Sequence, residues 1–224
     1  MRKLIFALLS CLYFLRGVAQ TDSVAMGQDF SLREGVYKSY SDLRRNNPIS
    51  KESIVSKEDK TQLDFIGKTL ASKKLVDLII DGGTYSFKVE ALWGYFQNNS
   101  LYLNFEGKFY RVPVFGAISH FIGTIEVINY MNGYGGMYGG GFYGPGMMMG
   151  GGMPVKQREV RQFLFDFYTG DIMDYNLPNV EILISRDLNL YTEFMNFKKK
   201  KRREMMMLYV RKYNQLHPAM FPKN

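Results

Sequence analysis

The sequence of 224 residues predicts an α+β fold: an antiparallel β-meander sheet, a short N-terminal helix and two or three C-terminal helices. Three observations predict it. Short runs with a period of two, separated by Asn and Gly turns, fill residues 75–127; a helix-capping pattern precedes them at Ser39; a helical period begins near residue 176. The apolar content of 46%, with 15% aromatic residues, supplies a buried core and excludes a wholly disordered chain.

The predicted N-terminal helix begins at a capping pattern. Ser39 is followed three residues later by Asp42, which is the spacing of a capping box. Asn47 stands before Pro48, and a residue before proline is pushed out of the α region. We therefore expect the helix to end there. Residues 50–74 are polar with weak periodicity, and we expect a loop with short elements.

The central segment is predicted to be a meander of antiparallel strands. Turn clusters at residues 97–100 and 106–108 separate short β-rich runs. Trp93 is expected to be largely buried on the core face of the sheet, and Gly94 to allow close approach of a neighbouring strand or ring. Residues 115–128 are expected to add one or two further strands.

The C-terminal part returns to a strand and then becomes helical. A strand is predicted over residues 159–168, with its aromatic residues on one face. Pro178 occupies an early-turn position of a first helix, and Asp187 is placed to cap a second one. A basic C-terminal helix is expected at about residues 190–213.

Three carboxylates lie close together around the end of that strand. Asp166, Asp171 and Asp174 could suggest a calcium site or a general acid–base pair, but their spacing is not that of an EF-hand loop. Asp171 is explained by a turn and Asp174 by an exposed strand face. We therefore expect structural roles for these side chains.

The N-terminal 19 residues have the three regions of a secretory signal peptide. Met1-Arg2-Lys3 is basic, Leu4–Leu15 is apolar except for one serine, and Gly17-Val18-Ala19 offers small residues before a cut at Gln20. The apolar run is shorter than the ~20 residues that span a bilayer. We expect residues 1–19 to be removed and residues 20–224 to form a single exported domain without a transmembrane span.

The inventory of catalytic residue types is small. Cys11, the only cysteine, loosely resembles a lipid-attachment site, but the apolar run continues past it, which favours conventional cleavage. There are two histidines: His120 is expected to be packed or edge-exposed, and His217 to lie at a frayed end. Neither a Gly-x-Ser-x-Gly nor a His-Glu-x-x-His motif occurs. We expect no catalytic residues, no cofactor and no metal site.

Two segments are candidate contact surfaces. Residues 131–153 contain eleven glycines and six methionines, which predicts an extended, flexible loop inserted between strands. A run of six basic residues lies in the predicted C-terminal helix. The segment from Glu193 to Asn224 contains nine basic and two acidic residues. An inert insertion and a solvated helix face are the open alternatives. The candidate contact residues are Tyr134, Met137, Tyr138, Phe142 and Tyr143 in the insertion and Lys198, Lys199, Lys200, Lys201, Arg202 and Arg203 in the helix.

Three short motifs resemble those of a group of uncharacterised exported proteins found in Bacteroidetes. They are Gly35-Val36-Tyr37 before a short helix, Trp93-Gly94-Tyr95 in a central hairpin, and Tyr213-Asn214 before His217-Pro218. The group has no known activity, so the resemblance implies export and a central Trp-Gly hairpin but no catalytic residue.

These observations lead to a non-catalytic, exported binding or accessory protein of the periplasm or cell envelope, or a secreted one, that acts by surface contact. The expected partner is an anionic membrane surface, an envelope polymer or another envelope protein. Nucleic acid is excluded as a partner because the chain is expected to be exported and lacks arrayed stacking aromatics on the basic helix. The alternative is a carboxylate-based hydrolase of envelope polymers, which needs two carboxylates ~5–10 Å apart in a cleft.

Overall fold

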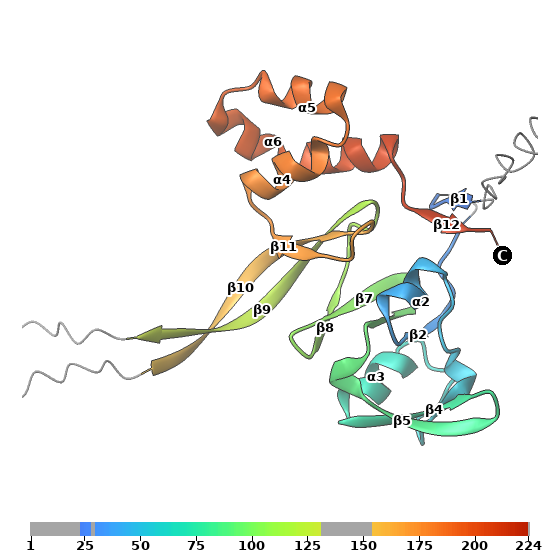
Figure 1. The fold of residues 1–224 in the computed structure, drawn as a ribbon. Coiled ribbons are helices and arrows are strands. Elements are labelled where there is room, and N and C mark those ends of the chain that lie inside the picture. The colour runs from blue at the N-terminus through green and yellow to red at the C-terminus, as the bar shows by residue number, and fades with distance from the viewer. Residues whose placement is uncertain (1–22, 28–29, 131–153, 224) are drawn as a thin grey trace, which may run out of the picture.

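The computed structural model describes residues 23–27, 30–130 and 154–223. It confirms a mixed α+β fold with antiparallel sheets (Figure 1). The strands do not form one central sheet, however. In the part of the chain that the structure describes they are divided among four small sheets.

The two sheets of the N-terminal half hold the predicted meander. In the first sheet the strand order is β2 (Gly35–Tyr37), β6 (Gly94–Gln97), β7 (Ser100–Phe105) and β8 (Lys108–Arg111). In the second sheet the order is β3 (Ile54–Val55), β4 (Leu75–Ile80) and β5 (Gly83–Lys88). The short 3-10 helix η2 (Val89–Ala91) separates β5 from β6, so the chain leaves one sheet and enters the other there.

The C-terminal half is a long hairpin covered by helices. β9 (Ile118–Tyr130) pairs along its whole length with β10 (Pro154–Asp166), and β11 (Ile172–Asp174) adds to the base of β10. Three helices lie on one side of that base (Figure 1): α4 (Leu177–Ile184), α5 (Leu188–Met195) and α6 (Lys199–Leu216). The ends of the described chain meet in a two-stranded sheet of β1 (Ser23–Ala25) and β12 (Met220–Pro222).

The helix starts predicted from capping residues are present. α2 (Tyr40–Arg44) begins after Ser39, whose hydroxyl accepts from the N–H of Asp42 at 3.2 Å while the Asp42 carboxylate accepts from the Ser39 N–H at 3.0 Å. Asp187 caps α5 by accepting from the Leu190 N–H at 2.9 Å. Each cap satisfies a backbone donor that the helix itself leaves unpaired.

Residues 50–74 hold more regular structure than their weak periodicity indicates. They contain the 3-10 helix η1 (Lys51–Ser53), β3 and the helix α3 (Phe65–Ala71). The buried residues of α3 include Phe65 and Leu70 near its two ends and the polar Thr69, and Gly67 and Lys68 interrupt its apolar face. An apolar pattern this short cannot be told apart from the neighbouring loop residues in the sequence.

The Trp-Gly step lies at the start of β6. Trp93 is half-buried, less than expected, because it stands just before the strand; its ring nevertheless packs on those of Tyr40 and Phe165, the latter with a centroid distance of 5.6 Å. The expected close approach at Gly94 is confirmed. A Cβ there would lie 2.4 Å from the carbonyl oxygen of Tyr102 in the paired strand β7.

Strand β10 connects two of the three buried clusters. As predicted, its aromatic side chains share one face, and Phe163, Phe165 and the following Phe167 enter a core with residues of β7 and β12. Leu164 points the other way into the core beneath α4, α5 and α6. A third cluster lies between α3, β4 and β6. Alternation along a single strand therefore binds the helices to the rest of the protein.

Asp166, which is buried at the end of β10, forms an ion pair with the partly exposed Arg186. Arg186 Nη1 donates to Oδ1 at 3.0 Å and Nη2 donates to Oδ2, while the Tyr168 N–H and the Thr169 hydroxyl donate to the same carboxylate at 2.9 and 3.0 Å. Burial raises the pKa of Asp166, but these donors, Arg186 foremost, outweigh it and hold the pKa below its usual value. The expected structural role of Asp166 follows from these contacts.

We predict that Asp166→Asn destabilises the fold at neutral pH by about 2 kcal/mol, because it leaves Arg186 without its counter-charge. The expected loss of stability is smaller than for breaking a fully buried ion pair, because the Arg186 side chain is 36% exposed. Because the pKa of Asp166 is lowered in the folded state, its carboxylate stabilises the fold at pH values above the unfolded-state pKa of about 3.9. This stabilisation is lost as the pH falls through the folded-state pKa. Urea unfolding at pH 7 and near pH 2.5 should show the difference from wild type shrink in acid. The exposed Asp174→Asn is the control, and an equal difference at both pH values would contradict the role of the ion pair.

Candidate functional site

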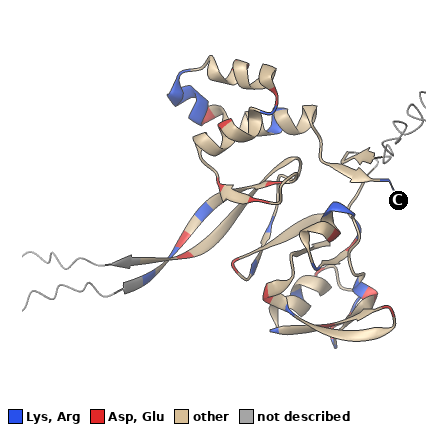
Figure 2. Cartoon of the chain, viewed as in Figure 1, with Lys and Arg blue, Asp and Glu red and all other residues tan. Residues whose placement is uncertain are grey.

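The structure describes six of the eleven predicted contact residues. Tyr134, Met137, Tyr138, Phe142 and Tyr143 lie outside the described residues. The basic run is described: Lys198 is the N-cap of α6, and Lys199–Arg203 form its first turns. We call residues 198–203 the basic corner, because they lie where α5 turns into α6 at the edge of the helical layer (Figure 2). The basic helix expected at about 190–213 is thus two helices, with the basic run at the start of the second.

Most cations of the basic corner lack a carboxylate partner. Lys201 lies 3.3 Å from Glu204 with both side chains half-exposed, and Arg202 lies 2.5 Å from Glu181. Within the described ranges, none of the other four has an ion pair: Lys198, Lys199, Lys200 and Arg203. The charge of the corner is therefore largely uncompensated and available to an outside anion.

The position of these cations is unfavourable for the helix itself. A helix N-terminus carries the positive end of the dipole, and acidic residues normally occupy its first turn. The first turn of α6 contains none, and Lys198 provides no side-chain cap. The lysines in this position therefore lower the stability of α6.

The surface beside the basic corner is hollowed and partly apolar. A cavity of about 520 Å³ lies between the starts of α4 and α6 and is lined by Pro178, Arg203 and Met206 among others. Arg202 borders it, and its Nε is buried without a hydrogen-bond partner. Met195, at the end of α5, is 40% exposed and contacts the Arg202 guanidinium through its sulfur at 2.7 Å. Cations and apolar groups are thus interleaved at this corner.

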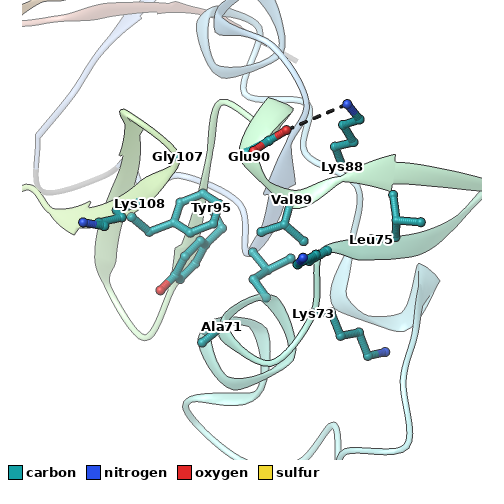
Figure 3. Close-up of a pocket in the computed structure, with 13 residues that line it drawn as sticks. Ala71, Lys73, Leu75, Lys88, Val89, Glu90, Tyr95, Gly107 and Lys108 are labelled. Carbon is teal, nitrogen blue, oxygen red and sulfur yellow. Dashed lines mark ion pairs between the residues drawn. The ribbon is translucent and has the colours of Figure 1, made fainter.

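A second hollow lies in the N-terminal half, in a place that the sequence did not indicate. Its cavity volume is about 880 Å³, and we call it the Tyr95 pocket (Figure 3). It is bounded by α3 and the residues after it, the η2 segment, β6 and the β7–β8 turn. The lining residues are Gly67, Leu70, Ala71, Lys73, Lys74, Leu75, Lys88, Val89, Glu90, Tyr95, Gly107, Lys108 and Phe109.

The remaining residues considered from the sequence have structural roles. His120 is buried, with Nε2 2.9 Å from Gln162 Oε1, in line with the packed position expected. The expected frayed position of His217 is wrong: its Nε2 lies 2.7 Å from Asp187 Oδ2, because the end of α6 packs against the start of α5. Asp171 lies beside the turn after β10, as expected, and its carbonyl accepts from the Asp166 N–H. Over the described ranges, no cluster of metal-ligating side chains occurs.

Comparison of the chain with family models, curated proteins and solved structures finds no match. Among the described helices, none combines the length and apolar character needed to cross a bilayer.

We predict that Lys199→Glu with Lys200→Glu raises the stability of the fold by about 0.3–1 kcal/mol per site at low ionic strength, because carboxylates then face the positive end of the α6 dipole. Urea unfolding at low and high salt measures the gain, which should shrink as salt screens it. The matched control is Arg211→Glu, which makes the same change of charge per site farther along α6, so the gains are compared per site. An equal gain from the control would show that only net charge matters and would contradict the dipole argument.

Proposed function

We propose that the chain is an exported, non-catalytic protein that acts by contact with an anionic membrane surface through the basic corner. The observation that carries this proposal is the uncompensated charge of Lys198, Lys199, Lys200 and Arg203 at a helix start that disfavours it. Binding an anionic surface would offset that cost. Each lysine or arginine near such a surface contributes about 1 kcal/mol.

The apolar groups at the same corner favour a lipid surface over a purely polar polymer. Met195 and the half-buried Phe197 stand next to the lysines at the α5–α6 junction. A basic patch beside apolar side chains is the combination by which peripheral proteins bind anionic bilayers. An envelope polymer or another envelope protein remains an outcome that the experiment below can reveal.

Export is inferred from the sequence. Residues 1–19 lie outside the described residues, and their signal-peptide pattern supports passage across a membrane. The resemblance to exported proteins of Bacteroidetes points the same way. A chain released from its signal peptide needs another means of staying at the envelope, and electrostatic contact through the basic corner would supply it.

No observation favours the hydrolase alternative. Asp166 is engaged by Arg186. Each of the two larger hollows of the described surface, and a smaller one beside α3, is lined by a single carboxylate: Glu90, Glu181 and Glu34. A carboxylate pair of the kind that glycoside hydrolysis needs is therefore not found in them.

The test is co-sedimentation of the secreted chain with vesicles. Wild type should pellet with phosphatidylglycerol vesicles and remain in the supernatant with phosphatidylcholine vesicles. Lys199→Glu with Lys200→Glu should weaken binding to the anionic vesicles at least tenfold, from the roughly 1 kcal/mol that each lysine contributes. Raising the salt should weaken wild-type binding as well, because exposed charges are screened beyond about 8 Å at physiological ionic strength.

The matched control is Lys57→Glu with Lys156→Glu, which changes net charge equally at two exposed lysines outside the corner. It should bind nearly as wild type does. Failure of wild type to pellet with anionic vesicles at low salt would contradict the proposal. So would an equal loss in the control pair, because net charge and not the corner would then decide. If the protein bound isolated envelope polymer and no vesicles, the partner would be the polymer and not the lipid.

A further inference from the structure

We propose that the Tyr95 pocket binds a single-chain anionic amphiphile, with the aliphatic chain on the apolar floor and the anionic head among the lysines of the rim. This inference goes beyond the proposed membrane contact, because it concerns a different surface and a ligand in solution. It stands on three independent features of the pocket: its floor, its charge and one unpaired polar group.

The floor of the pocket is apolar and partly uncovered. Leu70 and Val89 are buried beneath it, and Phe109 is half-buried at its side. Leu75, at the start of β4, is 55% exposed although it lines the same hollow. The volume of about 880 Å³ lies within the usual range of small-molecule sites, roughly 300–1,000 Å³. An aliphatic chain would cover this surface and gain the free energy of apolar burial.

The rim is cationic. Four lysines line the pocket, and the only carboxylate among the lining residues is Glu90, which lies 3.9 Å from Lys88. Both of these side chains are largely exposed, so the pair contributes little. In the described part of the chain, Lys74 and Lys108 have no ion-pair partner. In Figure 3, Lys108 lies on one side of the pocket and Lys73 and Lys88 lie on the other. The rim therefore selects a negative group.

Tyr95 provides the unpaired polar group. The residue is 6% exposed, yet its hydroxyl makes no hydrogen bond to any described residue. Burial raises the pKa of Tyr95, so the phenol stays protonated and can donate. Its ring is held by stacking on Tyr102 at 4.6 Å and by the edge of Phe109 at 5.1 Å. The hydroxyl oxygen itself is open to the pocket, where a carboxylate oxygen would accept a hydrogen bond from it.

Gly67 keeps room for that hydroxyl. A Cβ at this position would lie 2.9 Å from the Tyr95 oxygen. Glycine inside a helix is less favourable than alanine, so α3 contains a residue that weakens it at the position where the space is needed. The phenol and the apolar floor thus line one hollow with lysines at its rim, and a carboxylate carried on an aliphatic chain matches all three.

The test is isothermal titration calorimetry of the full chain with dodecanoate below its micelle concentration. Two further probes separate the parts of the ligand: dodecyltrimethylammonium has the same chain with the opposite charge, and acetate has the head without the chain. Dodecanoate should bind at one site, and both other probes should bind at least tenfold more weakly. Equal binding of the cationic probe would overturn the role of the lysine rim.

Variants locate the site. Ala71→Trp fills the pocket from an exposed position on α3 and should weaken dodecanoate binding at least tenfold while the protein stays folded. Lys74→Ala with Lys108→Ala should weaken it at least tenfold, because two cations that attract the carboxylate are lost. The matched control, Lys57→Ala with Lys156→Ala, should bind as wild type does.

Tyr95→Phe tests the unpaired donor. It should weaken binding by about threefold to tenfold, the range expected for a single hydrogen bond. The midpoint of urea unfolding should not fall, because the hydroxyl makes no contact that the fold needs. Lys199→Glu with Lys200→Glu should leave dodecanoate binding unchanged, which separates this site from the basic corner. Absence of dodecanoate binding by folded wild type, or undiminished binding by Ala71→Trp, would overturn the proposal.

Discussion

The alternation of side chains along β10 is the constraint on which the rest of the structure depends. Phe163 and Phe165 belong to the core of the meander, whereas Leu164 belongs to the core under the three C-terminal helices. Asp166 then fixes the base of the helical layer through Arg186. A shift of one residue in the register of β10 would exchange the two faces and place phenylalanine under the helices.

The two candidate sites lie in different parts of this arrangement. The helical layer held by β10 carries the basic corner at its edge (Figure 2). Lys199 and Lys200 are both exposed there. The Tyr95 pocket belongs to the third cluster, where α3 closes over β6. Both surfaces are cationic beside apolar groups, and both contain a residue that disfavours the local fold: lysines at a helix start and glycine inside a helix. That shared cost supports binding of anionic, partly apolar partners at both.

Features with a local cause could be predicted from the sequence. The capping box at Ser39, the cap at Asp187 and the turn at residues 97–100 depend on neighbours within a few positions, and each is present. The basic corner is likewise recognisable in the sequence as a run of six basic residues. The Tyr95 pocket is not, because Lys74 and Lys108 are brought to one rim only by the packing of α3 and β8 around β6. The ion pair of His217 depends on long-range packing in the same way.

Hydrogen–deuterium exchange of the full chain, with and without phosphatidylglycerol vesicles, tests the membrane contact most directly. The first N–H groups of a helix have no intrahelical acceptor, so the amides of Lys199–Lys201 should exchange rapidly in the free protein. The account predicts that vesicles slow exchange at residues 196–203 and leave the exposed β9–β10 hairpin unchanged. Unaltered exchange at 196–203, with slowing at the hairpin or elsewhere in the chain, would contradict it.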